Sequence, residues 1–157
     1  MDIKIDSTEG KFKFRVCGIL EHNNKYLAVN MNDNGFYCLP GGHVELGEDT
    51  DTAVLREMQE ELGYPVKIKR MVAFSQNFFE GKGKKFHEIG VYYIVNAVDE
   101  KQVNTNDYIR EELDKGMVQH LEFKWFTKQE LKQIDFRPKF IADCLDKRDV
   151  VFDITRD

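Results

Sequence analysis

Three glutamates lie close together near the middle of the chain, Glu57, Glu60 and Glu61, and Gly63 follows them. If this segment is helical, Glu57 neighbours Glu60 at i, i+3 and Glu61 at i, i+4 on one helix surface. Like charges at these spacings destabilise an isolated helix by about 0.2–0.5 kcal/mol per pair. A divalent cation would offset this repulsion, because hard cations such as Mg²⁺ bind carboxylate oxygens together with water and substrate phosphates. The spacing therefore predicts a metal site.

The residues around these glutamates favour the same chemistry. On a helical wheel the three carboxylates fall within an arc of roughly 100°, and Ala53, one turn earlier, leaves room for another segment to approach. Gly41 and Gly42 lie just upstream, where the absence of a Cβ lets the backbone come close to a ligand. Arg56 can pair with Glu60 at i+4 and orient its carboxylate. The loop carbonyls and the carboxylates are thus expected to meet at one cation site.

A helix over residues 50–62 must carry the glutamates. Asp49 or Thr50 can serve as its N-cap, and Gly63 can end it in a left-handed conformation. One apolar stripe along the predicted helix faces the core and consists of Val54, Leu55, Met58 and Leu62.

Strands are expected on both sides of this helix, because β-branched and aromatic residues dominate those segments. The predicted strands are 12–20 and 26–31, joined as a hairpin, then 36–39, 67–76, 86–97 and 121–126. Short helices are predicted over 128–133 and from Pro138 to about residue 146. Residues 98–119 are polar and without clear period, with a short helix expected near 108–115. This pattern predicts a single α/β (α+β) domain over residues 1–157, with a mixed sheet flanked by helices.

Charge and composition limit the classes of partner. The chain carries 23 basic and 28 acidic residues, and residues 41–64 alone hold seven acids and one base, so the remainder is close to neutral. A DNA-binding surface would need clustered Lys and Arg, so no DNA partner is expected. No apolar run approaches the roughly 18 residues of a membrane span, and no signal peptide begins the chain. The three cysteines have no zinc-site spacing. We expect a soluble cytoplasmic protein.

The pattern G-x5-E-x7-R-E-U-x-E-E-x-G-U, where U is a bulky apolar residue, is the Nudix box of the Nudix hydrolases. All seven of its specified glycine, glutamate and arginine positions are present, at Gly42, Glu48, Arg56, Glu57, Glu60, Glu61 and Gly63. The chain therefore resembles this family. Tyr64 departs from the usual aliphatic residue, which affects packing alone. The segment before the box, Leu39 to Gly42, and the pair Trp125-Phe126 are also similar to family members.

The resemblance implies an α/β/α sandwich with a mixed β-sheet. It also implies that water attacks phosphorus to cleave a nucleoside diphosphate linked to another group, with Mg²⁺ or Mn²⁺ as cofactor. The residue roles it implies are metal binding by Glu57, Glu60, Glu61 and the Gly41 carbonyl, and a link between loop and helix by Glu48 and Arg56. Glu57 is instead, or in addition, expected to help deprotonate the water. Metal ions would lower the water's pKa and clamp the attacking and leaving oxygens, whereas carboxylates alone would repel the substrate.

Many family members use a further glutamate from outside the box, often four to six residues before the tryptophan of the last strand. Here those positions hold Gln119, His120 and Leu121, and the nearest acids are Glu122, Glu111, Glu112 and Glu88. We take Glu122 as the first candidate, although an outward-facing strand residue would look the same in the sequence.

Substrate selection is harder to read. Arg15 could bind a phosphate bidentately or serve a structural role, and Glu88 is a second candidate for substrate binding. Loops 77–86 and 98–120 would choose the substrate but carry no motif. The predicted function is a Mg²⁺- or Mn²⁺-dependent pyrophosphohydrolase of a small nucleotide derivative. The alternatives are an RNA 5′-end pyrophosphohydrolase and a non-catalytic nucleotide sensor. An exposed strand edge and the final helix also leave room for a homodimer.

Overall fold

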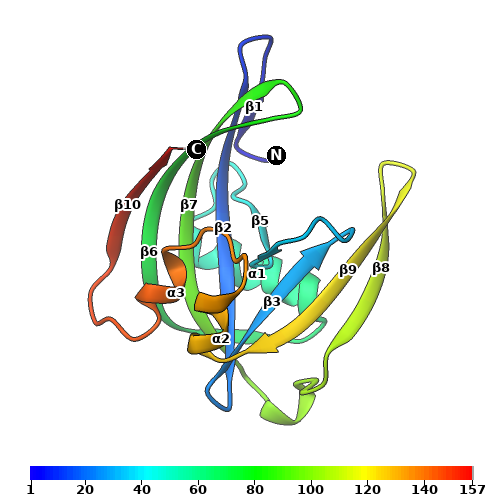
Figure 1. Cartoon of the computed structure of the whole chain (residues 1–157), viewed down its shortest axis with the longest axis vertical. Coiled ribbons are helices and arrows are strands. Elements are labelled where there is room, and N and C mark those ends of the chain that lie inside the picture. The colour runs from blue at the N-terminus through cyan, green and yellow to red at the C-terminus, as the bar shows by residue number, and fades with distance from the viewer. Residues whose placement is uncertain (157) are drawn as a thin grey trace.

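The computed structural model describes residues 1–156, which form one large mixed β-sheet with helices on both faces (Figure 1). The strands are β1 (Lys4–Asp6), β2 (Lys11–His22), β3 (Lys25–Met31), β4 (Tyr37–Cys38), β5 (Gly41–His43), β6 (Val66–Gly81), β7 (Lys84–Ala97), β8 (Tyr108–Asp114), β9 (Met117–Phe126) and β10 (Val151–Arg156). The helices are α1 (Thr50–Leu62), α2 (Lys128–Gln133) and α3 (Ile141–Cys144), with a 3₁₀ turn η1 (Glu100–Gln102).

The sheet is mixed because two of its strand pairs are parallel. Its main path runs β10-β6-β7-β2-β3-β9-β8, while β1 and β5 pair with β2 and β4 pairs with β3. The pairs β2–β7 and β6–β10 are parallel, whereas β6–β7, β2–β5, β3–β9 and β8–β9 are antiparallel.

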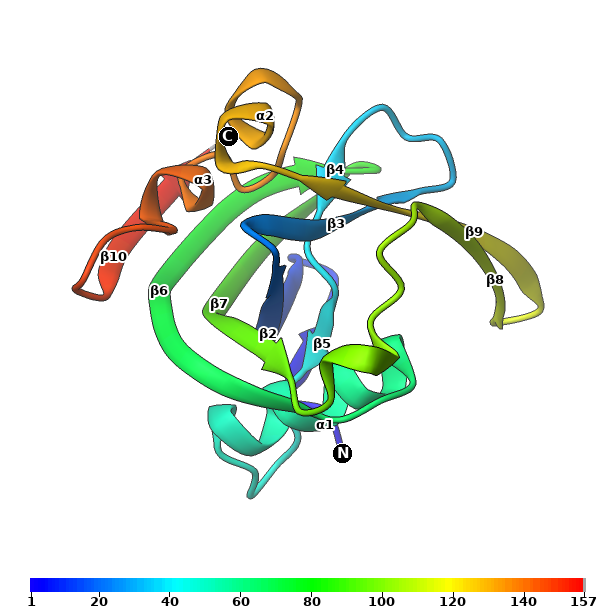
Figure 2. The same cartoon turned by 90° about the horizontal axis from the view of Figure 1, so that it is seen from below.

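Two cores lie on opposite faces of the sheet, one under α1 and one under α2 and α3 (Figure 2). Val16 of β2 packs with Val54 and Met58 of α1, whereas the next residue, Cys17, packs with Leu131 of α2 and Ile141 at the start of α3. Alternate strand side chains point to opposite faces, so β2 contributes to both cores. The predicted α/β/α arrangement with a mixed sheet is confirmed.

Helix α1 has the predicted bounds, and its caps explain them. The Asp49 carboxylate accepts a hydrogen bond from the Thr52 amide at 2.7 Å, and Gly63 ends the helix with φ 84°. The helix lies close to β2 because position 18 is glycine. A Cβ there would lie 2.3 Å from the Met58 sulfur, so Gly18 is what allows Met58 to pack against the strand.

The hairpins carry the strands that surround the box. Asn23 and Asn24 form the β2–β3 turn with φ of 50° and 60°, as asparagine tolerates, and the predicted hairpin is confirmed. The β6–β7 hairpin turns at Lys82 and Gly83, and both of its strands are longer than predicted. Strand β5 places Gly41 directly opposite Cys17 of β2.

The prediction of a short helix near 108–115 was wrong, because these residues form β8. Arg110, Glu111 and Glu112 are helix formers, but the segment pairs with β9 over its whole length, and tertiary pairing overrides the local propensity. Register places Arg110 opposite Leu121, which belongs to the core beneath α1. Arg110 and Glu112 therefore lie on the α1 side of the hairpin.

The C-terminal segment also differs from prediction. The final helix α3 covers Ile141–Cys144 and not the whole of 138–146, and a tenth strand, β10, follows it. Strand β10 forms one edge of the sheet and leaves Phe152 and Ile154 exposed, while the homodimer stays a prediction. Within residues 1–156, no helix is both long and apolar enough to cross a membrane.

Candidate active site

Arg56 joins the loop before α1 to the helix itself. Its guanidinium donates two hydrogen bonds to the Glu48 carboxylate, at 2.8 and 2.9 Å, and one to the His43 carbonyl at 3.1 Å. The same guanidinium donates to Glu57 at 2.8 Å. Glu60, the partner predicted from i, i+4 spacing, is farther away at 3.6 Å. The main partner of Arg56 is thus Glu48, in the bidentate geometry that gives charge-assisted hydrogen bonds their strength and direction.

The two carboxylates beside Arg56 have opposite electrostatics. Hydrogen bonds from Arg56 lower the pKa of Glu48 to about 2. Burial raises the pKa of Glu57, although Arg56 partly counteracts it. Glu48 is therefore stabilised as an anion by the protein alone, whereas Glu57 still lacks part of the positive charge that would compensate its desolvation.

Gly42 is required by the position of the Glu57 side chain. A Cβ at residue 42 would lie 2.2–2.4 Å from the carboxylate atoms of Glu57, so any other residue would displace them. Gly41 is equally constrained, because its Cβ would lie 2.1 Å from the Val16 carbonyl oxygen. The two glycines let the Glu57 carboxylate, the β5 backbone and β2 pack against one another.

Glu61 points away from Arg56 and meets Arg110 of β8. Arg110 Nη2 lies 2.7 Å from Glu61 and 3.0 Å from Glu112, and Nη1 donates to the Glu61 backbone carbonyl. One guanidinium nitrogen therefore lies between a box carboxylate and a carboxylate of the β8–β9 hairpin. Burial raises the pKa of Glu61, and Arg110 partly counteracts this. The sequence analysis missed Arg110, because its role depends on a strand pairing that local propensity hid.

Glu122 lies on the other face of the hairpin. Leu121 and Phe123 belong to the core under α1, so Glu122 between them faces away from that helix. Its carboxylate pairs with Lys124 at 3.2 Å. Of the acids considered outside the box, Glu112 is the one that shares a partner with a box carboxylate.

A cleft of about 1580 Å³ opens on the sheet face opposite α1, between β2, β6, β7 and β10 and the segment 132–140. Arg15 and Glu88, the two predicted substrate-binding residues, both line it. Arg15 is opposite His43 of β5 in the strand register, which places it next to the box loop. Its positive charge lowers the pKa of Glu57, against the larger effect of burial. Arg15 therefore lies between the cleft and the box loop, while Glu57, Glu60 and Glu61 do not line the cleft itself.

Comparison with known proteins agrees with this geometry. A model of the NUDIX domain matches residues 12–144, which is most of the chain. The chain belongs to the Nudix family.

Several Nudix relatives resemble the chain over different spans. It is 34% identical over 86 residues to an ADP-ribose pyrophosphatase of Methanocaldococcus jannaschii, covering 53% of this chain and 50% of that protein. It is 29% identical over 129 residues to the nucleoside triphosphatase NudI of Escherichia fergusonii, covering 76% and 85%. The chain thus spans about half the length of the archaeal relative and most of the bacterial one.

Solved structures show the same fold. A Nudix hydrolase from Nitrosomonas europaea superposes with a TM-score of 0.61 at 19% identity, covering 92% of this chain and 79% of the other. An ADP-ribose pyrophosphatase from Streptococcus suis superposes with a TM-score of 0.57 at 18% identity, covering 90% and 98%. The predicted family and fold are confirmed, and the two relatives named above carry the names of a pyrophosphatase and a nucleoside triphosphatase.

The donor atoms of this Nudix domain suit a hard divalent cation. Glu57, Glu60, Glu61 and the Gly41 carbonyl offer oxygen ligands, as Mg²⁺ and Mn²⁺ prefer. In the described part of the chain no three His, Cys, Asp or Glu side chains are grouped closely enough to hold a metal. The box carboxylates are kept apart because Glu57 is hydrogen-bonded to Arg56 and Glu61 to Arg110. The oxygen donors would suit a metal if Glu61 turned from Arg110 toward the other box carboxylates.

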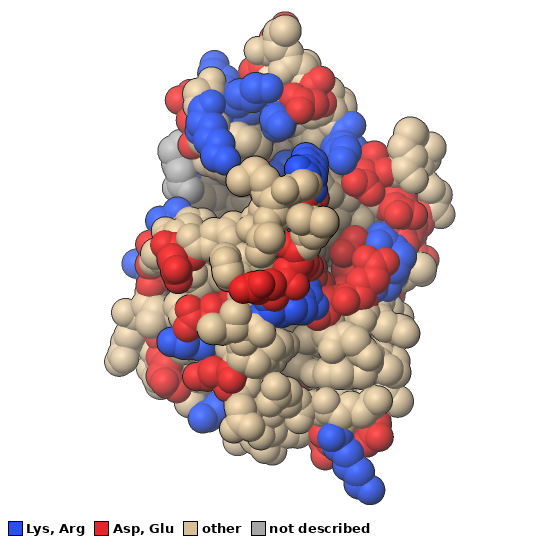
Figure 3. All heavy atoms as spheres, turned by 90° about the vertical axis from the view of Figure 1, so that its right-hand side faces the viewer, with Lys and Arg blue, Asp and Glu red and all other residues tan. Residues whose placement is uncertain are grey.

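The surface around the box carboxylates carries acidic side chains with basic side chains between them. Figure 3 shows the face that carries β8 and β9, where acidic side chains gather across the middle with basic side chains beside them. The exposed fraction of the side chain is 62% for Glu60 but 15% for Glu57. Glu60 is therefore the box carboxylate that solvent, and an arriving cation, reaches first.

Proposed function

We propose that this protein is a Mg²⁺- or Mn²⁺-dependent pyrophosphohydrolase that cleaves a nucleoside diphosphate linked to another group. The observation that carries the proposal is the position of the Glu57 carboxylate, which is packed against Gly42 and hydrogen-bonded to Arg56. A largely buried carboxylate with incomplete charge compensation suits binding of a cation, and Arg15 in the cleft suits binding of phosphates.

In this proposal Glu57, Glu60, Glu61 and the Gly41 carbonyl hold the metal. When bound, the metal supplies a water of lowered pKa and neutralises charge on the phosphoryl oxygens. Glu57 accepts the proton of the attacking water, and Arg56 fixes the carboxylate that does so. Glu48 holds Arg56 in place through two hydrogen bonds, so it acts on the chemistry through position alone.

Arg15 binds the substrate phosphates on the cleft side. It makes no hydrogen bond or ion pair with any other residue in 1–156, so its fork of donors is available to an anion. We place the nucleoside further along the cleft, away from the box, where Glu88 lies.

A substrate screen tests this proposal. The names of the relatives suggest ADP-ribose and nucleoside triphosphates as the first compounds, followed by nucleotide sugars, dinucleoside polyphosphates and RNA with a 5′-triphosphate. Products would be separated by chromatography with Mg²⁺, with Mn²⁺ and with EDTA. We expect metal-dependent cleavage of at least one small nucleotide. Tight nucleotide binding without cleavage of any compound would instead support a sensor, and cleavage in EDTA would refute the metal site.

A further inference from the structure

Three rows of side chains cross the floor of the cleft, and strand register sets their order. Arg15 of β2 is opposite Gly90 of β7, and Lys13 is opposite Glu88, which is opposite Asn77 of β6. Phe86 of β7 is opposite Phe79 of β6. Each row is two residues from the next, so all three rows share one face and are separated by roughly 7 Å.

The first row is the phosphate end, because it adjoins the box. Gly90 has no side chain, and the Tyr92 hydroxyl occupies the space where a Cβ would lie, 2.9 Å away. The floor beside Arg15 is thus flat and polar, which leaves the guanidinium accessible from the cleft.

The second row presents acceptors. The Glu88 side chain is 13% exposed, and its one ion pair within residues 1–156 is to Lys13 at 3.7 Å, too long for a hydrogen bond. Asn77 donates to Ser75 at 3.3 Å, while its Oδ1 has no hydrogen-bond partner in the described chain. Buried polar atoms are rarely left without partners in native proteins. A carboxylate beside an amide oxygen suits a ligand that offers neighbouring hydroxyl donors.

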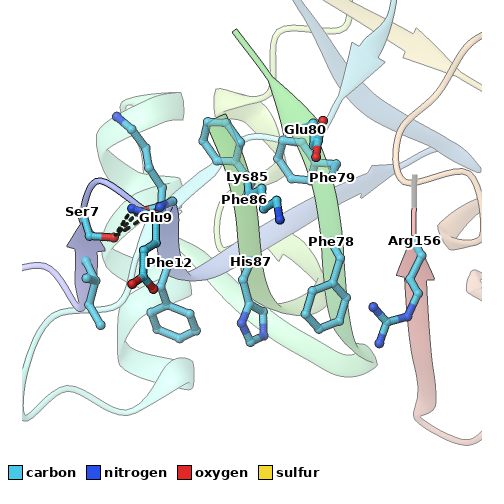
Figure 4. Close-up of a pocket in the computed structure, with 13 residues that line it drawn as sticks. Ser7, Glu9, Phe12, Phe78, Phe79, Glu80, Lys85, Phe86, His87 and Arg156 are labelled. Carbon is cyan, nitrogen blue, oxygen red and sulfur yellow. Dashed lines mark hydrogen bonds between the residues drawn. The ribbon is translucent and has the colours of Figure 1, made fainter. Parts of the chain in front are cut away.

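The third row is aromatic. Phe79 and Phe86 stack with ring centroids 4.8 Å apart and planes 1° from parallel, and Lys13 lies over the Phe86 ring at 5.2 Å. Figure 4 shows both rings on the opposite side of β6 and β7 from Phe78 and His87. Both rings line the cleft, and neither belongs to the two buried cores. A partly exposed aromatic pair that lines a cleft offers a contact surface for a nucleobase.

We propose that these three rows bind one ribonucleotide, with its phosphate on Arg15, its ribose hydroxyls on Glu88 and Asn77, and its base against Phe79 and Phe86. The order of the rows matches the order of phosphate, sugar and base in a nucleotide. The inference rests on the proposed function, because the phosphate end is placed by the Nudix box. It deepens that function by naming a ribonucleoside as the part of the substrate held in the cleft.

The outer face of the same strands supplies a matched control. There His87 stacks on Phe78 at 4.4 Å, Phe12 packs edge-on against His87 at 5.3 Å, and Arg156 lies over Phe78 at 4.4 Å. Figure 4 shows these four side chains in a row on the other side of the strands from Phe79 and Phe86. Phe12, His87 and Phe78 do not line the cleft, whereas Arg156 also borders it. Phe78 and Phe79 are consecutive in the chain but face opposite sides, so the same substitution can be made on each.

The first test compares Phe79→Leu with Phe78→Leu. Binding of AMP is measured by calorimetry without metal, so that the result does not depend on the box carboxylates or on turnover. Phe79→Leu is expected to weaken AMP binding about fivefold or more, the lower end of what base stacking supplies, and Phe78→Leu to leave it unchanged. Equal effects would overturn the proposal. If Phe79→Leu does not fold, as judged by thermal unfolding, Phe86→Leu takes its place.

The second test addresses the ribose. The wild-type protein is expected to bind AMP about tenfold more tightly than 2′-deoxy-AMP, since a hydrogen bond to a charged acceptor is lost. In Glu88→Gln this ratio should fall toward one, while Glu100→Gln, an exposed control on η1, should keep it. A ratio near one in the wild type, or an unchanged ratio in Glu88→Gln, would refute ribose recognition. These binding assays need neither metal nor cleavage. A negative substrate screen would therefore refute the proposed hydrolysis without deciding whether the cleft binds a ribonucleotide.

Discussion

Two arginines hold the carboxylates of this site, and they come from very different places in the chain. Arg56 is eight residues from Glu48, within one motif, and its hydrogen bonds connect a loop to the helix that follows. Arg110 is 49 residues from Glu61 and reaches it from the β8–β9 hairpin. The first pair is structural and nearly closed to solvent at Glu48. The second is more open, and it involves Glu61, a carboxylate that the proposed metal site would use.

This difference suggests that the two guanidinium groups have different roles at the site. Arg56 is held by Glu48 through two hydrogen bonds, so we expect this pair to persist when a metal binds. Arg110 partly compensates the charge of Glu61, and in the proposed mechanism the metal would replace it there.

The largest effect is expected for Arg56→Gln. Removing this guanidinium leaves Glu48, whose side chain is 12% exposed, without its charge partner. Loss of one member of a buried pair costs about 3 kcal/mol in the free energy of unfolding, and turnover should fall roughly 100-fold as Glu57 loses its orientation. Urea denaturation and steady-state kinetics measure the two effects. A loss below about 1 kcal/mol would show that the clamp is not structural.

Next in size is the effect of the carboxylate outside the box. Glu112→Gln is expected to lower turnover about tenfold, because Glu112 shares Arg110 with Glu61 and so acts on a metal ligand. Glu122→Gln is the matched control on the other face of the hairpin and should change turnover little. A larger fall in kcat for Glu122→Gln than for Glu112→Gln would identify Glu122 as the further glutamate.

A smaller effect is expected for Arg110→Gln. Its partners are partly exposed, so the free energy of unfolding should fall by at most about 1 kcal/mol. Mn²⁺ should bind about fivefold more tightly in the absence of the competing guanidinium, if the pair is worth about 1 kcal/mol. Electron paramagnetic resonance titration of free Mn²⁺ measures this. Weaker Mn²⁺ binding would mean that Arg110 supports the metal site and does not compete for it.

The smallest effect is on the acid stability of the protein. The pKa of Glu48 is lowered from 4.5 to about 2, so the unfolded state binds more protons between these values. The stability that Glu48 contributes is present above pH 4.5 and is lost as the pH falls toward 2. Glu48→Gln should remove about 1 kcal/mol of this pH dependence, allowing for solvent screening. Glu61 should not contribute in the same direction, because burial raises its pKa. The free energy of unfolding would be measured between pH 5 and 2 for the wild type and for Glu48→Gln. The same dependence on pH in both proteins would show that Glu48 is not paired.

The same contrast explains how much of the molecule could be read from the sequence. The α1 helix, its caps and the β2–β3 hairpin depend on neighbouring residues, so local patterns predicted them. The Arg56–Glu48 pair falls within the box spacing, and the resemblance implied that both residues join loop and helix. Strand β8 and Arg110 depend on pairing with β9, and residues 108–115 carry helix-forming charges that hide this pairing. Strand β10 pairs in parallel with β6 and was not predicted, although residues 150–155 are rich in β-branched and aromatic residues.

The cleft shows an intermediate case. Arg15 and Glu88 could be selected from residue type, and both line it. Their arrangement with Phe79 and Phe86 needed the register of β2, β6 and β7, which shifts at two irregularities within β6. Counting along the strands from the sequence would not reveal which phenylalanine faces the cleft.

The central claim is that the box carboxylates hold a metal used in hydrolysis. The most direct measurement is the initial rate of cleavage of the best substrate against Mg²⁺ concentration, for the wild type and Glu61→Gln. We predict no turnover in EDTA, saturable activation of the wild type, and a rate in Glu61→Gln at least 100-fold lower at saturating Mg²⁺, about 3 kcal/mol in transition-state stabilisation. Equal rates in the two proteins, or full activity without metal, would contradict the account.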